Sequence, residues 1–425
     1  MSESSSAEHE LPLLAFAYHP RSFGTMAIAE ATEGICRLLW ILDTSDPEVG
    51  SMARFLRRLG SVVDVAGMGL EEAAEAVAAC KPEAILALAD GLLLWTARLA
   101  ELLDLRFLSP EVAERFTDKY LQREALQRAG VPVPGFWPVP DLGDEAGWAA
   151  LEQSARFPAV LKPRSGEGSR DIVRVHSFQE LRSLVEQTPH ELDAGPPAMV
   201  LEEYLIDRPE HAGEHFADYV SVESVVSDGR VSHLAITGRF PPAEPFRETG
   251  FFIPSAVEEP ESTAIALAAT AAVHAIGIRA GLLHTEVKMT PLGPRVIELN
   301  GRIGGGVPEM LADACGVELM GMAFRLALGE SLVFDSMPVC KRVGYLLYVQ
   351  APYAMSTITA VEGLERLRTQ PGVQEVTLNR GPGSAVSWRS GNHGHVFSVR
   401  GSAPDHESLR ALERFVKDEV QILGE

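Results

Sequence analysis

Hydrophobic and polar positions divide the chain into successive blocks, and the first block alternates apolar runs with helical patterns. The apolar runs are residues 11–18, 37–42, 61–66 and 83–89, and residues 70–80 show the clearest helical pattern between them. Strands that alternate with helices predict a parallel sheet covered by helices on both sides. The turn after the first run lacks the GxGxxG spacing of a dinucleotide site. We therefore expect residues 1–108 to form a Rossmann-like scaffold without its own nucleotide, and a true NAD-binding domain is the alternative.

The pattern changes at residue 109. Residues 109–130 predict one long amphipathic helix, with Ser109 as its N-cap, Pro110 at its first position and Gly130 as its stop. A proline-rich connector follows, and a second α/β block then runs from about residue 158 to residue 329. Its expected strands are residues 157–162, 171–176, 198–205, 218–226, 230–238, 282–289 and 294–300.

Two further segments complete this organisation. A helix over residues 260–277 places four apolar side chains on one buried stripe, namely Ile265, Ala269, Val273 and Ile276. The last block, from about residue 341 to residue 422, mixes strands with helices, among them a helix over residues 358–370. This block is too small and too poor in polar clusters to form a separate enzyme.

Composition narrows the class of protein. The chain has 425 residues, 46% of them hydrophobic, which suits a globular protein of about two to four domains and excludes a disordered chain or a coiled coil. Its 37 basic and 59 acidic residues give a net charge of −22, which argues against a general nucleic-acid binder. No apolar run reaches the ~18 residues of a membrane helix, and the polar start does not resemble a signal peptide. The cysteines, Cys36, Cys80, Cys315 and Cys340, form no CxxC pair, so we expect a reduced, cytoplasmic protein rather than disulfides or a metal site.

Two lysines and a glycine-rich loop form the first candidate site. Lys162 ends an apolar strand, where a lysine cannot stay buried without an anionic partner, and Lys119 lies in the preceding helical segment. The loop after Lys162 contains Ser165, Gly166 and Ser169 and can wrap backbone N–H groups around phosphates. Two surface lysines beside a hairpin turn are the alternative interpretation.

Two acidic strands joined by a turn over residues 290–294 form the most specific candidate. On the first strand His284, Glu286 and Lys288 share one face. If the two strands pair, Glu286 faces Glu298 and Asn300. Three oxygen donors, with the phosphates of a nucleotide, are a typical shell for Mg²⁺. The alternative is a pair of acids on a solvated sheet face.

The second of these strands continues into an anion-binding signal. Alternation along it predicts two faces, one with Val296, Glu298 and Asn300 and the other with Ile297 and Leu299. Arg302 follows, and a glycine run that includes Gly305 and Gly306 opens a helix. Free N–H groups and the positive end of the helix dipole favour an anion at this point.

Two irregular segments supply the remaining candidates. In residues 200–207, backbone groups can read an adenine edge while a carboxylate accepts the ribose hydroxyls; an edge strand with solvated acids is the alternative. The loop over residues 239–255 carries charge and aromatic side chains, which favours a functional loop over a surface excursion. Here Arg247 can face the carboxylate of a small zwitterion and Glu248 its ammonium group.

The order of these motifs resembles the ATP-grasp superfamily over about residues 109–329. The motifs are DKY with LQRAGVPVP, FPAVLKPRSGEGS, VLEEYL, YVSVES, and HTEVK with IELNGRIGGG. Within the superfamily, HTE, ELNGRIGGGVPEM and EPFRETG look most like the carboxylate–amine ligases that join amino acids, the L-amino-acid (dipeptide) ligases. The resemblance implies an α/β ATP-grasp fold with a Rossmann-like N-terminal domain (1–108), a central ATP-grasp domain (109–329) with a lid over about 131–205, and a small C-terminal α+β lobe (330–425).

The resemblance also implies roles for the candidate residues. The nucleotide would be bound by Lys119, Lys162, Ser165, Gly166 and Ser169 at its phosphates and by Glu202, Glu203, Tyr204 and Leu205 at adenine. The ribose-binding acid stays open among Asp207, Glu210, Glu214 and Asp218, with Glu210 included in the nucleotide site. Two Mg²⁺ ions, for which Mn²⁺ can substitute, would be held by Glu286, Glu298 and Asn300. The reacting groups would be stabilised by Arg302 with Gly305 and Gly306. The substrate would meet Arg247, Glu248, Glu223 and His284, although a structural role for His284 is the alternative.

The implied activity is the ATP-dependent formation of an amide. ATP would convert a carboxylate, expected to belong to an amino acid, to an acylphosphate, and an amine would then displace phosphate. The expected partners are small molecules, with neither nucleic acid nor membrane, and a homodimer is expected because relatives often form dimers. Two alternatives stay open: a ligase or carboxylase for a purine precursor or bicarbonate, and a nucleotide-binding regulator without turnover.

Overall fold

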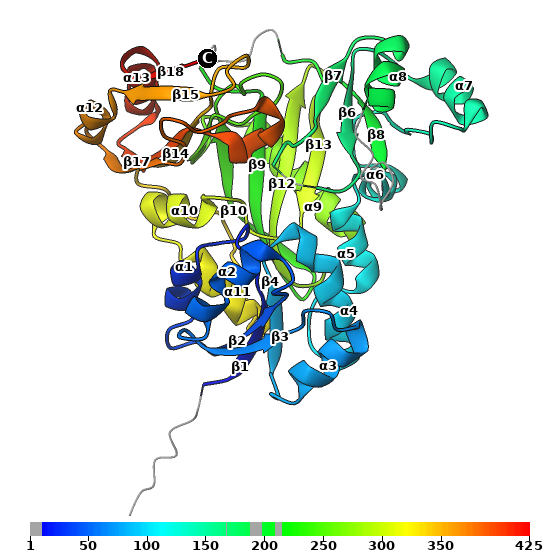
Figure 1. The fold of residues 1–425 in the computed structure, drawn as a ribbon, viewed down its shortest axis with the longest axis vertical. Coiled ribbons are helices and arrows are strands. Elements are labelled where there is room, and N and C mark those ends of the chain that lie inside the picture. The colour runs from blue at the N-terminus through cyan, green and yellow to red at the C-terminus, as the bar shows by residue number, and fades with distance from the viewer. Residues whose placement is uncertain (1–10, 167, 188–197, 209–214) are drawn as a thin grey trace, which may run out of the picture.

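The computed structural model describes residues 11–166, 168–187, 198–208 and 215–425. This part of the chain forms an N-terminal α/β domain, a small antiparallel sheet with its own helices, and a long antiparallel sheet (Figure 1). Glu210 and Glu214, two of the candidates for the ribose, lie outside the described residues.

The N-terminal domain is the predicted parallel sheet. Its strands lie in the order β3-β2-β1-β4, and every pair is parallel. The elements are β1 (Leu13–Ala17), α1 (Thr25–Ala31), β2 (Arg37–Leu42), α2 (Pro47–Leu56), β3 (Ser61–Asp64), α3 (Leu70–Ala78), β4 (Ala84–Ala87), the short helix η1 (Asp90–Leu92) and α4 (Leu93–Leu103). Trp40 and Phe16 are fully buried at its centre, where their rings meet edge to face. Because β1 and β4 are neighbours but not consecutive, the loops that follow them leave the same edge of the sheet side by side.

Two helices, over residues 110–117 and 119–128, connect the N-terminal domain to the small antiparallel sheet. Its strands follow the order β5-β8-β6-β7, and its core surrounds Trp148 and Leu161. The elements of this region are α5 (Pro110–Thr117), α6 (Lys119–Arg128), β5 (Phe136–Pro138), α7 (Glu145–Ser154), β6 (Ala159–Pro163), β7 (Val173–Val175), α8 (Phe178–Gln187) and β8 (Met199–Glu203). The predicted lid therefore has its own hydrophobic core, so it is able to move as a unit.

The long sheet joins the middle of the chain to its end. Its strand order is β13-β12-β9-β10-β11-β14-β17-β16, so three strands from the last hundred residues extend a sheet that the middle of the chain begins. The elements are β9 (Tyr219–Ser227), β10 (Arg230–Arg239), β11 (Gly250–Ile253), α9 (Glu261–Ile276), β12 (Gly281–Thr290), β13 (Gly293–Asn300), α10 (Val307–Cys315), α11 (Leu319–Ala327), β14 (Val343–Val349), β16 (Val373–Leu378) and β17 (Phe397–Ala403). The stripe predicted on α9 is confirmed, because Ile265, Ala269, Val273 and Ile276 are all buried.

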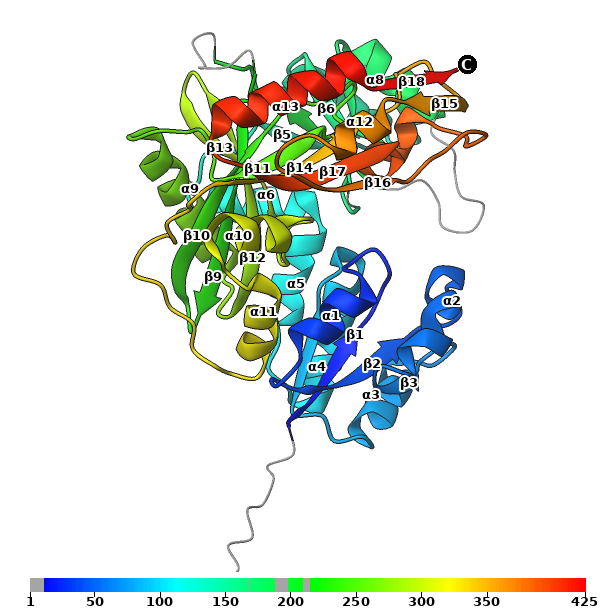
Figure 2. The ribbon, with the colours of Figure 1, turned by 90° about the vertical axis from the view of Figure 1, so that its left-hand side faces the viewer.

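The end of the chain packs on the last strands of this sheet. The remaining elements are β15 (Ile358–Glu362), α12 (Leu364–Arg368), the short helix η2 (Trp388–Gly394), α13 (His406–Glu419) and β18 (Gln421–Gly424). Figure 2 shows α13 lying along the part of the sheet formed by β14 and β17, where Leu409 and Val416 of the helix share a core with Tyr345. None of the helices in the described ranges combines the length and apolar content needed to span a bilayer.

Three predicted elements differ from the structure. The single helix over residues 109–130 is wrong: it is two helices, because Asp118 adopts an extended conformation and its carboxylate accepts hydrogen bonds from the first N–H groups of α6. The loop over residues 239–255 is shorter than predicted, since β10 includes Arg239 and β11 begins at Gly250. The helix over residues 358–370 begins with strand β15, and Gly363, with φ of 90°, separates that strand from the short α12.

Candidate active site

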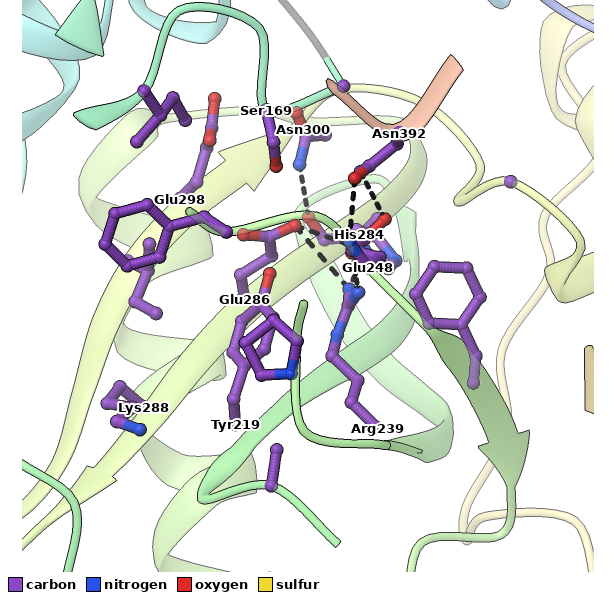
Figure 3. A pocket seen from close by; sticks show the side chains of 18 of the residues that line it. Ser169, Tyr219, Arg239, Glu248, His284, Glu286, Lys288, Glu298, Asn300 and Asn392 are labelled. Carbon is purple, nitrogen blue, oxygen red and sulfur yellow. Dashed lines mark hydrogen bonds and ion pairs between the residues drawn. The ribbon is translucent and has the colours of Figure 1, made fainter. Parts of the chain in front are cut away.

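The candidate residues converge on one large cavity of about 840 Å³. The small sheet, the long sheet and the loops after β1 and β4 all contribute to its lining. Figure 3 shows that Glu286, Glu298, Asn300 and His284 point toward the same space, which Ser169 approaches from the glycine-rich loop. The cavity is large enough for a nucleotide and a small substrate together.

A buried triad of charges holds Lys162. The side chain is 4% exposed, and its Nζ lies 2.8 Å from Oε2 of Glu202, whose Oε1 lies 3.0 Å from Nε of Arg123. Burial would raise the pKa of Glu202, but Arg123 and Lys162 outweigh it, so the pKa is lowered and the carboxylate stays ionised. Burial lowers the pKa of Lys162, although Glu202 acts in the opposite direction. Two cations and one anion leave this buried group with a surplus positive charge at the cavity wall.

Lys119 lies near this group, at the first position of α6. Its Nζ is 2.9 Å from Oε1 of Glu298 and donates to the carbonyl oxygen of Gly166 over 2.8 Å. Burial disfavours the charge of Lys119, but Glu298 outweighs it and raises the pKa. Ser165, Gly166 and Ser169 line the cavity with both lysines, so the structure brings together every predicted phosphate-binding residue.

The predicted adenine segment divides in two. The residues that line the cavity are Glu203, Tyr204 and Leu205, together with Asp207 and Asp218 further along the chain. Glu202 does not line the cavity, and its side chain pairs with Lys162 and Arg123. Glu203 accepts a hydrogen bond from the backbone N–H of Gly135 over 3.0 Å, which fixes the edge of the segment.

The two acidic strands pair as the sequence predicts at their carboxylates. Glu286 lies directly opposite Glu298, and His284 lies opposite Asn300. A β-bulge beside Glu286 corrects the predicted alternation: Ile297 is the extra residue, so Val296 packs in the same core as Leu299 while Ile297 lines the cavity with Glu298. The bulge turns the end of β13 so that its polar side chains reach the cavity.

The oxygen donors on these strands suit a divalent cation. Burial would raise the pKa of Glu286, but hydrogen bonding to His284 and the charge of Arg239 lower it strongly, so this carboxylate is ionised. Among the described residues, no group of three or more His, Cys, Asp and Glu side chains could hold a metal ion without other ligands. An ion here would therefore need the Asn300 oxygen and nucleotide phosphates in addition to Glu286 and Glu298.

Arg239, rather than the predicted Arg247, lines the cavity. Arg247 does not line the cavity, because its guanidinium donates to the carbonyl oxygens of Glu244 and Ala351 over 2.7 and 2.9 Å. Arg239 is 3% exposed, pairs with Glu248 and lies 3.5 Å from Glu286. Burial and the nearby Glu286 raise the pKa of Glu248, although Arg239 opposes them.

His284 links this group to a second buried acid. Its Nδ1 lies 2.9 Å from Oε2 of Glu223, and its Nε2 lies 3.0 Å from Nη2 of Arg239. Burial would lower the pKa of His284, but Glu223 outweighs it and raises the pKa to about 9. Glu223 stands behind the histidine and does not line the cavity, so its effect on a ligand would pass through His284.

Arg302, Gly305 and Gly306 complete the predicted set at the start of α10. Arg302 and Gly305 line the cavity, and Gly306 is the N-cap with φ of 70°. A Cβ added at Gly304 would lie 2.4 Å from Nδ1 of His284, so the glycine run lets the backbone pass close to the histidine.

Two buried arginines and one amide side chain in or beside the site were not predicted from the sequence. Arg123 lies four residues after Lys119 on α6, a spacing that places two basic side chains on one helix face and was a usable signal. Arg239 had the period-2 spacing of its strand as a signal, since Thr237 two residues before it also lines the cavity. Asn392 had none: it comes from η2, and its side chain hydrogen-bonds Glu248 across 144 residues of sequence.

Comparisons with known proteins agree with this geometry. The family model described as ATP-grasp domain matches residues 155–309. The chain is 29% identical to alanine–anticapsin ligase of Bacillus subtilis over 49% of this chain and 46% of that protein. It is 30% identical to carnosine synthase 1 of Gallus gallus over 43% of this chain and 20% of that protein. The matches thus span less than half the length of these relatives.

A solved structure matches over almost the whole chain. The L-amino acid ligase from Bacillus licheniformis superposes with a TM-score of 0.77 at 22% identity, over 98% of this chain and 99% of the other. At this identity the likeness concerns the fold. The family model thus identifies residues 155–309 as an ATP-grasp domain, and the superposition shows that the chain has the ATP-grasp fold.

Proposed function

We propose that the protein is an ATP- and Mg²⁺-dependent ligase that joins the carboxylate of an amino acid to an amine and releases ADP and phosphate. One observation carries the proposal: two buried lysines, Lys119 and Lys162, line a single cavity together with the carboxylates of Glu286 and Glu298. The names of the two relatives support the substrate class, because one is a ligase of the amino acid alanine with anticapsin and the other is a carnosine synthase.

The phosphate-binding residues would act by position and charge. Lys119, Lys162 and the glycine-rich loop would hold the nucleotide phosphates. Bound by Glu286, Glu298 and the Asn300 oxygen, Mg²⁺ would neutralise charge on the transferred phosphoryl group. Tyr204 and the backbone of Leu205 would read adenine, and Asp207 or Asp218, both in the cavity lining, would bind the ribose.

The chemistry would proceed in two steps. A carboxylate oxygen of the substrate attacks the γ-phosphorus of ATP, the bond to the ADP oxygen breaks, and an acylphosphate forms. The amine nitrogen then attacks the acyl carbon, the carbon–oxygen bond to phosphate breaks, and the amine proton leaves to solvent. Arg302 and the N–H groups of Gly305 and Gly306 would stabilise the negative charge that develops in both steps.

The far end of the cavity would hold the zwitterionic part of the substrate. Glu248 is an acceptor for an ammonium group, and Arg239 with His284 supplies positive charge beside it. Glu223 raises the pKa of His284 to about 9 while the charge of Arg239 opposes it, so Glu223, His284 and Arg239 form one chain of polar contacts that would fix Arg239 beside the substrate.

A phosphate-release screen tests the proposal. Incubation with ATP, Mg²⁺ and pairs of amino acids should release phosphate and ADP, and mass spectrometry should find an amide product. A Lys162→Met variant serves as the control for contaminating ATPases. Release of AMP with pyrophosphate would contradict the proposal, and phosphate release with bicarbonate alone would favour a carboxylase. ATP-induced stabilisation that persists in Glu298→Ala, without turnover on any pair, would favour a nucleotide-binding regulator.

A further inference from the structure

An ion pair joins the N-terminal domain to the predicted catalytic arginine. Asp90 begins η1 directly after β4, and Arg302 follows β13, 212 residues later in the chain. Oδ2 of Asp90 lies 2.6 Å from Nη2 and 2.9 Å from Nε of Arg302. Nη1 of the same guanidinium donates to the carbonyl oxygen of Ile303 over 3.0 Å. One carboxylate oxygen of Asp90, in the N-terminal domain, thus accepts hydrogen bonds from two N–H groups of Arg302.

The pair lies at the cavity wall rather than on the open surface. The side chains of Asp90 and Arg302 are 17% and 18% exposed, so their attraction is weakly screened by water. Arg302 lines the cavity, whereas Asp90 stands behind it and does not. The hydrogen bonds of Asp90 would therefore affect a bound ligand through Arg302, while its charge also helps to raise the pKa of Lys119.

Packing alone does not fix the arginine. A second cavity of about 60 Å³, lined by apolar side chains such as Leu88 and Leu282, also borders Arg302. A long side chain beside empty space keeps several rotamers unless a directional contact selects one. The two hydrogen bonds that Arg302 donates to Asp90 select one rotamer. A guanidinium that donates through both Nε and Nη2 to one oxygen is held in a single plane.

We propose that Asp90 is a positioning residue that fixes Arg302 for phosphoryl transfer and so makes the N-terminal domain part of the reaction centre. The proposal rests on the proposed function for its catalytic meaning. The loop after β4 would then serve the reaction, although the sequence of the N-terminal domain contains no dinucleotide-binding motif. In the sequence, the feature that corresponds to this function is an acidic residue, Asp90, within the apolar run of residues 84–94.

The chain offers a matched control for domain docking. Asp228 pairs with Arg106 over 2.7 Å and also joins the two domains, but these side chains are 61% and 51% exposed and neither lines the large cavity. Asp228 has φ of 50°, a conformation that asparagine tolerates well. Asp228→Asn therefore removes an interdomain ion pair of the same kind without touching the site.

Kinetics and binding together test the proposal. Asp90→Asn should lower kcat at least tenfold and leave KM for ATP within about twofold, because a charge-assisted contact acting on the reacting group is lost. Asp228→Asn should match the wild type. In an Arg302→Ala background Asp90→Asn should lower kcat by a much smaller factor than in the wild type, since its hydrogen bonds act through the arginine and only its charge on Lys119 remains to be lost. Asp90→Glu keeps the charge and should retain intermediate kcat, which guards against a loss caused by misfolding.

A binding measurement separates this proposal from the proposed function. The affinity for orthovanadate, measured by calorimetry in the presence of MgADP, should fall at least tenfold in Asp90→Asn, with MgADP affinity unchanged. If the wild type turns over no amino-acid pair, the proposed function fails, and the vanadate affinities still decide the role of Asp90. Equal kcat and equal vanadate affinity in Asp90→Asn and Asp228→Asn, or full additivity with Arg302→Ala, would overturn the inference.

Discussion

Replacement of Lys162 by methionine separates a phosphate-binding lysine from a structural one. Lys162, Glu202 and Arg123 form a buried group with a surplus positive charge. Methionine keeps the apolar stem of the lysine and removes the ammonium group, and Glu202 keeps its contacts to Arg123 at 3.0 and 3.3 Å. The substitution therefore leaves a neutral buried pair in place of a cationic triad.

The size of the effect follows from which charge loses its partner. Lys162→Met leaves no buried charge unpaired, so the free energy of unfolding should change by about 1 kcal/mol or less. Glu202→Gln instead leaves Lys162 and Arg123 buried without their shared anion, which should cost about 3–5 kcal/mol. The affinity for ATP should behave in the opposite way for Lys162→Met, with Kd higher by about tenfold to a hundredfold for a lost charged hydrogen bond of about 1.5–3 kcal/mol.

Urea unfolding followed by circular dichroism and calorimetric titration with ATP measure the two quantities. The stability ranking should be wild type and Lys162→Met together, with Glu202→Gln far below them. If Lys162→Met loses as much stability as Glu202→Gln and still binds ATP normally, Lys162 is a structural counter-ion for Glu202. The phosphate site would then lie elsewhere in the cavity.

Three further predictions concern other parts of the structure. Gly306→Ala should lower the free energy of unfolding by about 1–2 kcal/mol, because φ is 70° and a Cβ would meet a side chain at 2.4 Å, whereas Gly305→Ala, with nothing within 4 Å, should leave urea stability unchanged. Glu298→Gln should raise the Mg²⁺ concentration for half-maximal phosphate release by about tenfold in a metal titration, and an unchanged midpoint would exclude Glu298 as a ligand. Burial lowers the pKa of His233 below its ordinary 6.5, so the unfolded chain takes up a proton first and stability should fall as pH drops below 6.5. Urea midpoints at pH 7.5 and 5.5 should show a smaller loss in His233→Gln than in the wild type, with His274→Gln, on the exposed face of α9, as the control.

The parts of the fold that the sequence predicts are those that depend on local patterns. Apolar runs of four to eight residues identify the parallel strands, and the period of Ile265, Ala269, Val273 and Ile276 identifies the buried face of α9. The break between the two helices at Asp118 was not predicted, because the residues on both sides of it share one helical pattern. Only the capping geometry of its carboxylate, a three-dimensional fact, shows where one helix ends and the next begins.

The site was predictable where one motif held several of its residues and unpredictable where distant segments meet. Glu286, Glu298 and Asn300 lie on one hairpin, so their proximity follows from pairing alone. The bulge at Ile297 has no local sequence signature and shifts the alternation by one residue. Arg239 replaces Arg247 at the cavity because β10 extends one residue further than its predicted end, and the choice between two arginines depends on that residue.

The ion pairs at the cavity explain how a strongly acidic protein can offer a site to a tetra-anion. Lys119 pairs with Glu298, Lys162 with Glu202, and Arg302 with Asp90, so each buried cation has an acid within 3 Å. These acids compensate the cations while the cavity holds no ligand, which avoids the cost of burying an unpaired charge. In the proposed complex, phosphate would replace Glu298 at Lys119 while Mg²⁺ takes up the freed carboxylate, so the number of opposite-charge contacts is conserved. The net charge of −22 then affects only the long-range field, and the exchange of partners within a few ångströms determines binding.

Glu298 is the acid in this set that must change partners, since Glu202 keeps Arg123 and Asp90 keeps Arg302. Binding of ATP should therefore depend on Mg²⁺ partly through Glu298, and Glu298→Gln should weaken the dependence of ATP affinity on the metal.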